Sequence, residues 1–114
     1  MGWYLFIDDD ARTPDLESWR YPPNQLGWKI AVSTEEAQTL VETFGIPSLI
    51  DFDHDLGPLP DGTIDTSMRF LKWLSDKYPD AIKTIEDYSI HSQNPTGARN
   101  IQSFMESWRR STEM

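Results

Sequence analysis

Two largely apolar runs that each lead into a cluster of carboxylates constrain the fold of this chain more than any other feature. The first run, Trp3–Ile7, is followed directly by three aspartates, and the second, 48–52, leads into Asp53 and Asp55. Continuous apolar runs are typical of strands that are buried on both faces of a parallel sheet. Open α/β sheets bind ligands at the carboxyl ends of their strands, which is where these acidic residues fall.

The remaining patterns predict strands alternating with helices. Residues 28–32 are expected to form a second short strand, and Ser33 with Glu36 is typical of a capping box that begins a helix. The apolar face of that helix is expected to consist of Ala37, Leu40, Val41 and Phe44. Gly45 and Pro47 end it. A second helix is predicted from Asp65 or Thr66, either of which can cap it, to about Tyr78, a fourth strand over 87–91, and a last helix from Thr96 or Gly97 onward.

Two segments are predicted to be irregular. Residues 11–27 contain three prolines, so the helix expected after the first strand is degenerate. Residues 57–62 are rich in glycine and proline and are predicted to form a loop. Right-handed crossovers then bring the carboxyl ends of all strands to one edge of the sheet.

Composition limits the classes of function. The 114 residues suit one domain, 1–114, and the 38% hydrophobic content indicates a globular chain. The chain has no cysteine, no apolar run long enough to span a membrane and no leader-like start, which together favour a cytoplasmic protein. The net charge of −9 argues against binding to long duplex nucleic acid. It is compatible with a small phosphorylated ligand held through a metal, or with a basic protein partner.

Seven polar residues are expected to meet at the carboxyl edge of the sheet, and they include both histidines of the chain. They are Asp8, Asp9, Asp53, His54, Asp55, His91 and Ser92. This coincidence is the strongest indication of function in the sequence.

The four aspartates among them predict a metal site. Asp8, Asp9, Asp53 and Asp55 supply the hard oxygen ligands that Mg²⁺ or Mn²⁺ prefers. The alternative is that they are solvated acidic loop ends. Asp51 is expected to lie deeper in its strand as a structural carboxylate.

The two histidines suit general acid–base chemistry near neutral pH. His54 and His91 could open a cyclic phosphate, one activating water and the other protonating the leaving oxygen. The alternative is that each ring only makes a local hydrogen bond. Simple strand alternation turns His54 away from Asp53, so a catalytic His54 requires the strand to end and turn, and Gly57 permits such a turn.

Further residues suit the binding of phosphate oxygens. Ser92 and Asn94 precede a helix start, whose free amides can bind anions. Arg12 and Arg99 could supply positive charge, and a structural salt bridge of Arg12 with the first acidic cluster is equally expected. Asn100, one turn into the helix, either faces the site or is exposed.

Some of these residues resemble the receiver domain of response regulators. Asp8 and Asp9 match its acidic pair, Asp53 its phospho-accepting aspartate, Asp55 the residue whose backbone carbonyl reaches Mg²⁺, and Ser92 its hydroxyl residue after strand four. The departure is that only one helix follows the fourth strand. The fifth strand of a receiver and its lysine are therefore expected to be missing.

A narrower family, the cyclic-phosphate-processing receiver-like domains, is similar over nearly the whole chain. The matching residues are Leu5-Phe6-Ile7-Asp8-Asp9, Arg12, Pro14, Ser33, Glu35-Glu36-Ala37, Phe52-Asp53-His54-Asp55-Leu56-Gly57, His91-Ser92, Asn94, Gly97 and Asn100-Ile101. The resemblance implies a three-layer, receiver-like (flavodoxin-like) α/β domain, truncated relative to a full receiver. About four parallel strands are expected in the order 2-1-3-4.

The resemblance and the edge residues together predict a metal-dependent phosphoesterase that acts on a cyclic phosphate, at an RNA end or on a small nucleotide. His54, His91 and Asp53 are the expected catalytic residues. Two alternatives remain open. One is a binding or interaction module that sequesters a cyclic nucleotide or inhibits a protein, and the other is a receiver phosphorylated at Asp53.

Overall fold

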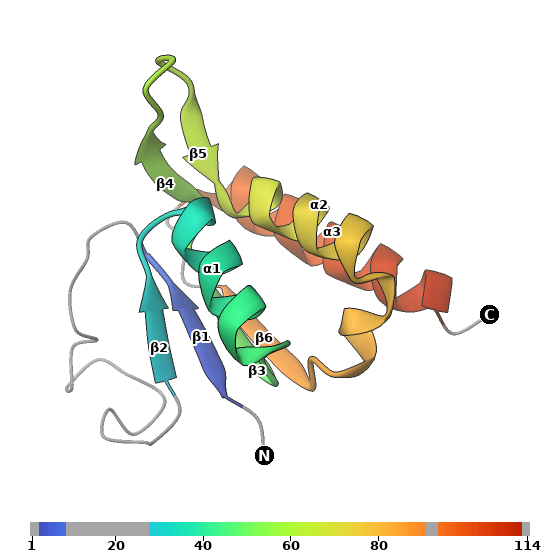
Figure 1. The fold of residues 1–114 in the computed structure, drawn as a ribbon. Coiled ribbons are helices and arrows are strands. Elements are labelled where there is room, and N and C mark those ends of the chain that lie inside the picture. The colour runs from blue at the N-terminus through green and yellow to red at the C-terminus, as the bar shows by residue number, and fades with distance from the viewer. Residues whose placement is uncertain (1–2, 9–27, 91–93, 113–114) are drawn as a thin grey trace, which may run out of the picture.

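The computed structural model describes residues 3–8, 28–90 and 94–112 (Figure 1). Four strands form the main sheet: β1 (Tyr4–Ile7), β2 (Trp28–Ala31), β3 (Leu49–Phe52) and β6 (Asp87–Ile90). Two more form a separate hairpin, β4 (Asp55–Pro58) and β5 (Ile64–Thr66). The helices are α1 (Thr34–Phe44), α2 (Ser67–Lys77), the 3₁₀ helix η1 (Pro79–Lys83) and α3 (Pro95–Thr112). None of the helices in this described part is long and apolar enough to cross a membrane.

The main sheet is parallel, and its strands lie in the order β2-β1-β3-β6. This confirms the receiver-like α/β fold and the predicted order 2-1-3-4. Ile7 pairs with both Ala31 and Phe52, and Phe52 pairs with Ile90, so the four strands end level with one another. The residues that follow β1 and β3 therefore lie side by side at one edge.

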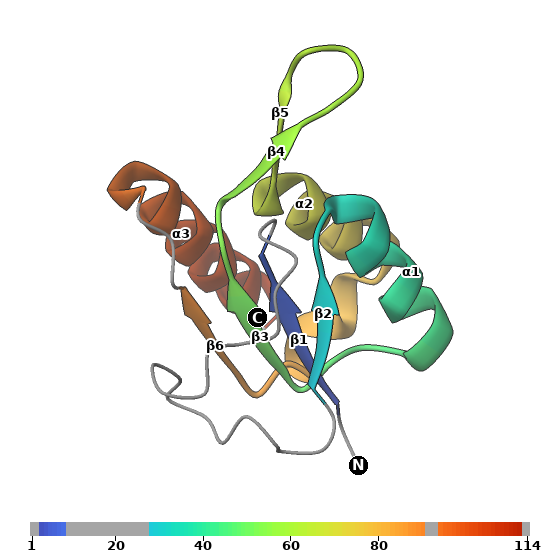
Figure 2. The same ribbon diagram turned by 90° about the vertical axis from the view of Figure 1, so that its left-hand side faces the viewer.

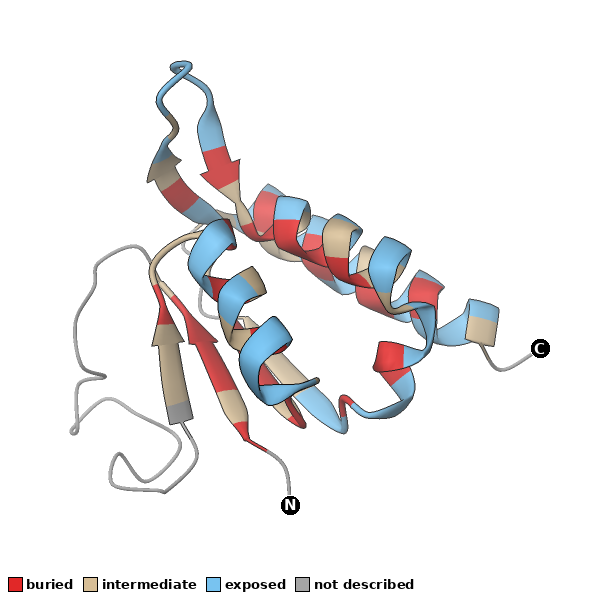
Figure 3. Ribbon diagram, viewed as in Figure 1, coloured by how far each residue is buried: buried red, intermediate tan, exposed pale blue. Residues whose placement is uncertain are grey.

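The three α-helices pack on the same face of this sheet (Figures 1 and 2). Leu5, Ile7, Ile50 and Phe52 point toward them and are fully buried or nearly so, in one apolar core with the inner faces of the helices. Those inner helix faces are the buried stripes in Figure 3. The third layer expected on the opposite face depends on residues 9–27, which lie outside the described residues.

Helix α1 begins as its capping sequence predicts. The backbone N–H of Glu36 donates to Ser33 Oγ at 3.2 Å, and Glu36 Oε1 accepts from the backbone N–H of Val32 at 3.0 Å. Ala37 and Val41 are buried, whereas Phe44, predicted to face the core, is 52% exposed. It lies at the end of the helix, where its ring contacts Trp3 and the Lys29 ammonium instead.

The expected loop over 57–62 is confirmed for residues 59–62, whereas Gly57 and Pro58 belong to strand β4. The loop joins β4 to β5, and the two strands pair as an antiparallel hairpin that stands away from the main sheet (Figure 1). The backbone N–H of Leu59 donates to Thr63 O at 2.7 Å, and that of Gly62 donates to Leu59 O at 2.9 Å. Gly62 has a φ of 90°, which favours glycine. The turn residues thus occupy the tip of a hairpin, and Asp61 Oδ1 accepts from the backbone and hydroxyl of Thr63.

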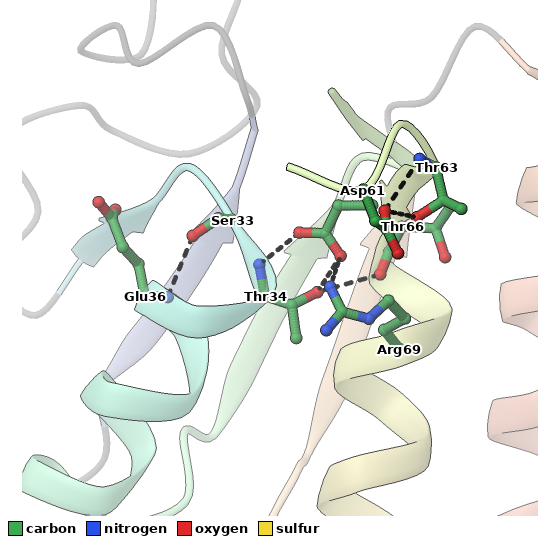
Figure 4. Close-up of polar contacts among 8 residues, drawn as sticks. Ser33, Thr34, Glu36, Asp61, Thr63, Thr66 and Arg69 are labelled. Atoms are coloured by element: carbon green, nitrogen blue, oxygen red, sulfur yellow. Dashed lines mark hydrogen bonds and ion pairs between the residues drawn. The ribbon is translucent and has the colours of Figure 1, made fainter. Parts of the chain in front are cut away.

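Asp65 joins this hairpin to helix α1 through hydrogen bonds to Thr34, which Figure 4 labels together with Arg69. Of the two alternative caps that the sequence offers for α2, Asp65 and Thr66, the N-cap is Thr66, whose side chain makes no capping hydrogen bond. The Asp65 carboxylate is buried and accepts from the Thr34 backbone at 2.9 Å, the Thr34 hydroxyl at 2.7 Å and Arg69 Nη1 at 2.7 Å. Burial alone would raise the pKa of Asp65, but the hydrogen bonds from Thr34 and the nearby Arg69 outweigh it and lower the pKa.

Candidate functional site

The described residues include seven of the eleven candidates that the sequence singled out. They are Asp8, Asp53, His54, Asp55, Asn94, Arg99 and Asn100. The other four, Asp9, Arg12, His91 and Ser92, lie outside the described residues, and their roles stay predictions.

Asp8 and Asp53 follow the ends of the adjacent strands β1 and β3. The backbone N–H of Asp8 donates to Ala31 O at 3.0 Å, and that of Asp53 donates to Ile7 O at 3.0 Å. These bonds continue the ladder of the sheet by one residue and hold the two aspartates at its carboxyl edge. Both are half-buried, whereas Asp51 lies within β3 and is fully buried.

The described aspartates meet part of what a metal site requires. Within the described ranges, no three acidic or histidine side chains converge on one point. Two carboxylates with water and substrate oxygens are nevertheless a typical ligand set for Mg²⁺. Asp8 and Asp53 supply two carboxylates at neighbouring strand ends, and Asp9, the third predicted ligand from this edge, directly follows Asp8 in the sequence.

The chain turns immediately after β3, at His54. Strand β3 ends at Phe52, and His54 lies in a bend before β4 begins. The start of α2 holds this bend, because the Ser67 backbone N–H donates to His54 O at 3.0 Å and the Ser67 hydroxyl donates to Asp53 O. A catalytic His54 required the strand to end and turn, and the chain does so at His54 itself, before Gly57.

The His54 imidazole is mostly buried and has a close polar partner. Its Nδ1 lies 2.7 Å from Asp55 Oδ1, and only 13% of the side chain is exposed. An ionised carboxylate only accepts hydrogen bonds, so the proton of this bond belongs to Nδ1. In the neutral ring, Nε2 then carries the lone pair.

Gly97, in the first turn of α3, forms the surface on which this ring lies. A Cβ atom at Gly97 would come within 2.3 Å of His54 Cγ and 2.6 Å of Nδ1. Only a residue without a side chain therefore allows α3 to approach the imidazole so closely.

The N-terminus of α3 is already capped. Asn94 Oδ1 accepts from the Gly97 backbone N–H at 3.0 Å, and Asn94 O accepts from the Ala98 backbone N–H at 2.9 Å. Pro95, the first helical residue, has no N–H to offer. The start of α3 thus offers an anion fewer free backbone N–H groups than the sequence suggested.

The remaining polar candidates have different surroundings. Asn94 Nδ2 lies 3.5 Å from Asp55 Oδ2, at the long limit of a hydrogen bond. Asn100 and Arg99 are exposed on α3. Asp55 is also exposed by about half, but its two carboxylate oxygens face His54 and Asn94.

Sequence reasoning missed two residues that shape this site. Ser67 holds the bend at His54, and Gly97 receives the ring. A glycine inside a predicted helix is a recognisable signal of close approach. Nothing local marks Ser67, because its partners lie thirteen or fourteen residues earlier and meet it only in the folded chain.

Comparisons with individual curated proteins and solved structures identify no close relative of this chain. No curated protein matches the chain. Among solved structures, NtrX from Brucella abortus is similar, with 14% identity and a TM-score of 0.45 over 98% of this chain. This chain spans 28% of the length of that protein.

The comparison with protein families covers most of the structure described above. A model described as the cyclic-phosphate processing receiver domain matches residues 3–107, from the residue before β1 into the last turns of α3. The match includes the carboxyl edge with Asp8 and Asp53, the bend at His54 and the helix start at Gly97. The chain belongs to the family of cyclic-phosphate-processing receiver domains.

Proposed function

We propose that this domain is a metal-dependent phosphoesterase that hydrolyses a cyclic phosphate on a small nucleotide or at an RNA end. One observation carries the proposal. The His54 imidazole is held at the edge that bears Asp8 and Asp53, with Nδ1 on a carboxylate 2.7 Å away. A histidine ordered in this way is suited to proton transfer through Nε2.

His54 takes the role of general base or general acid in this proposal. Water attacks phosphorus, the base accepts a proton from that water, and the P–O bond to one ribose oxygen breaks. The acid protonates that leaving oxygen, so one water is consumed and a phosphate monoester is formed. His91, which directly follows β6 in the sequence, takes the complementary role.

Asp8, Asp9 and Asp53 would hold Mg²⁺ or Mn²⁺. Such a cation, when bound, offsets the negative charge of the phosphate and orients its oxygens. A chain with a net charge of −9 would otherwise repel an anionic substrate, which supports a role for a cation here. Arg12, Ser92, Asn94 and Asn100 are the proposed contacts to phosphate oxygens.

The proposal is tested with a panel of 2′,3′- and 3′,5′-cyclic nucleotides and a short RNA that ends in a 2′,3′-cyclic phosphate. We expect the purified protein to open at least one of them when Mg²⁺ or Mn²⁺ is added, and chelation to stop the reaction. His54→Gln should lower kcat by about 10²-fold or more. Lys72→Gln, an exposed change on α2, is the matched control and should leave kcat unchanged.

Failure to open any member of the panel with either metal would refute the proposal. Calorimetry with the same cyclic nucleotides then tests the main alternative, because a binding module would bind one of them with a defined affinity and would not turn it over. A phosphorylated receiver would instead gain one phosphoryl mass from acetyl phosphate, and Asp53→Asn would not.

A further inference from the structure

We infer that Asp55 and Asn94 are positioning residues for His54, which select Nε2 as the nitrogen that meets the phosphate. The inference rests on the proposed function and gives Asp55 a role different from the metal ligand that the sequence suggested. Three contacts carry it: one sets the tautomer of the ring, one orients the carboxylate, and one fixes the plane of the imidazole.

The first contact is the hydrogen bond between His54 Nδ1 and Asp55 Oδ1 at 2.7 Å. This short distance is typical of a bond to an ionised oxygen. Because the carboxylate has no proton to give, it stabilises the neutral ring with the proton on Nδ1. A carboxylate bound to a histidine in this way also stabilises the imidazolium that forms when Nε2 accepts a proton.

The second contact joins Asn94 to the same carboxylate. Asn94 Oδ1 accepts from the Gly97 backbone N–H at 3.0 Å, which determines how the side-chain amide is oriented. Its Nδ2 must then point the other way, and it lies 3.5 Å from Asp55 Oδ2. The N-cap of α3 therefore also orients the group that holds His54.

The third contact is steric. The ring lies against Gly97, where even a methyl group would come within 2.3 Å of Cγ. With only 13% of the side chain exposed, the imidazole has little room to turn over and exchange its two nitrogens. The helix start and the hydrogen bond thus select the same orientation.

The tautomer of His54 tests this directly, without reference to catalysis. Nitrogen-15 spectra of the ring at alkaline pH, where imidazole is neutral, should show the Nδ1–H form in the full chain. His91→Gln identifies which of the two histidine signals belongs to His54. Asp55→Asn should shift His54 toward the Nε2–H form, because an asparagine amide can donate to Nδ1.

Metal binding separates positioning from ligation. Titration with Mn²⁺ should give Asp55→Asn the affinity of the natural chain to within about twofold, whereas Asp53→Asn should bind much more weakly. If the domain turns over a cyclic nucleotide, Asp55→Asn should lower kcat by about 10²-fold and leave KM nearly unchanged. Asp55→Glu should restore part of that loss, since it returns a carboxylate.

Asn94→Asp tests the contribution of Asn94 while keeping the cap of α3, since aspartate and asparagine cap helices equally well. It replaces the donor facing Asp55 by a second carboxylate, so we expect the thermal midpoint to be retained and the Nδ1–H population of His54 to fall. An unchanged His54 tautomer in this variant would remove Asn94 from the inference.

An Nε2–H form of His54 in the natural chain, or a loss of Mn²⁺ affinity in Asp55→Asn as large as in Asp53→Asn, would overturn the inference. An Asp55-dependent tautomer with no turnover of any cyclic phosphate would uphold the positioning of His54 and refute the proposed phosphoesterase. The two hypotheses therefore fail separately.

Discussion

Replacing Gly97 by alanine adds one methyl group at the place where the His54 ring lies. The new Cβ would be 2.3 Å from Cγ, 2.6 Å from Nδ1 and 2.7 Å from Cδ2 of the imidazole. Carbon atoms in contact are separated by about 3.5 Å or more, so the ring must retreat by about 1.2 Å. A retreat of that size breaks the 2.7 Å hydrogen bond to Asp55 unless the carboxylate follows.

The change in stability should be small, because two effects oppose one another. Alanine stabilises a helix interior by up to about 1 kcal/mol relative to glycine. Inserting a methyl group into a well-packed contact costs about 1–3 kcal/mol. We therefore expect Gly97→Ala to lower the free energy of unfolding by about 0–2 kcal/mol, which leaves the domain folded.

The change in activity should be much larger. Displacing a catalytic group by about 1 Å can cost about 10²-fold in rate, so kcat on a responsive cyclic nucleotide should fall by that factor. Urea denaturation measures the stability, and the His54 ring signals report the displacement whether or not a substrate is found. Ser103→Ala, an exposed change on the same helix, is the control that raises helix propensity alone. Unchanged His54 signals and full activity in Gly97→Ala would refute the reasoning.

Two further predictions concern contacts that hold the scaffold of the site. Asp65→Asn should lower the free energy of unfolding at neutral pH by about 2–3 kcal/mol, because charge-assisted bonds to Thr34 and Arg69 are lost. Folding lowers the pKa of Asp65. The contribution of its carboxylate to the free energy of unfolding is therefore fully present above the usual aspartate pKa of about 3.9, and it is lost as the pH falls through the lower pKa that Asp65 has in the folded chain. Urea denaturation at neutral and acid pH should show that the free energies of unfolding of the natural chain and of Asp65→Asn become more similar on acidification. A difference between them that does not change with pH would contradict this account. Trp108→Phe removes the 2.9 Å hydrogen bond from Trp108 Nε1 to Pro79 O and should lower the free energy of unfolding by about 1–2 kcal/mol. Urea denaturation measures this change as well. An unchanged urea midpoint would show that this bond does not hold α3 to η1.

The amino-acid sequence by itself determined the architecture on which the site is built. The two largely apolar runs predicted the central parallel strands, and the structure confirms the order of the sheet. The capping box at Ser33 predicted the start of α1 correctly. These features were readable because burial patterns and helix caps depend on residues that are close together in the chain. The same patterns placed Asp8 and Asp53 at strand ends, and the parallel register then sets them side by side.

Predictions that depended on distant partners were less successful. The segment 57–62 has the composition of a loop and contains one, but the pairing of β4 with β5 on either side of it was not predicted. Asp65 was one of two candidate caps for α2, but Thr66 is the N-cap and Asp65 binds Thr34, thirty-one residues earlier. Phe44 continued the apolar spacing of α1, yet the core ends before it is reached.

The chemistry of the site was decided in the same way by tertiary structure. The sequence placed His54 among aspartates, but it left open whether the strand ends before His54, and with that the direction of the ring. The bend held by Ser67, the carboxylate of Asp55 and the bare backbone of Gly97 determine that direction together. Asp55 is the neighbour of His54 in the sequence, but Ser67 and Gly97 come from separate segments of the chain, and their contacts with His54 exist only once those segments are folded against one another.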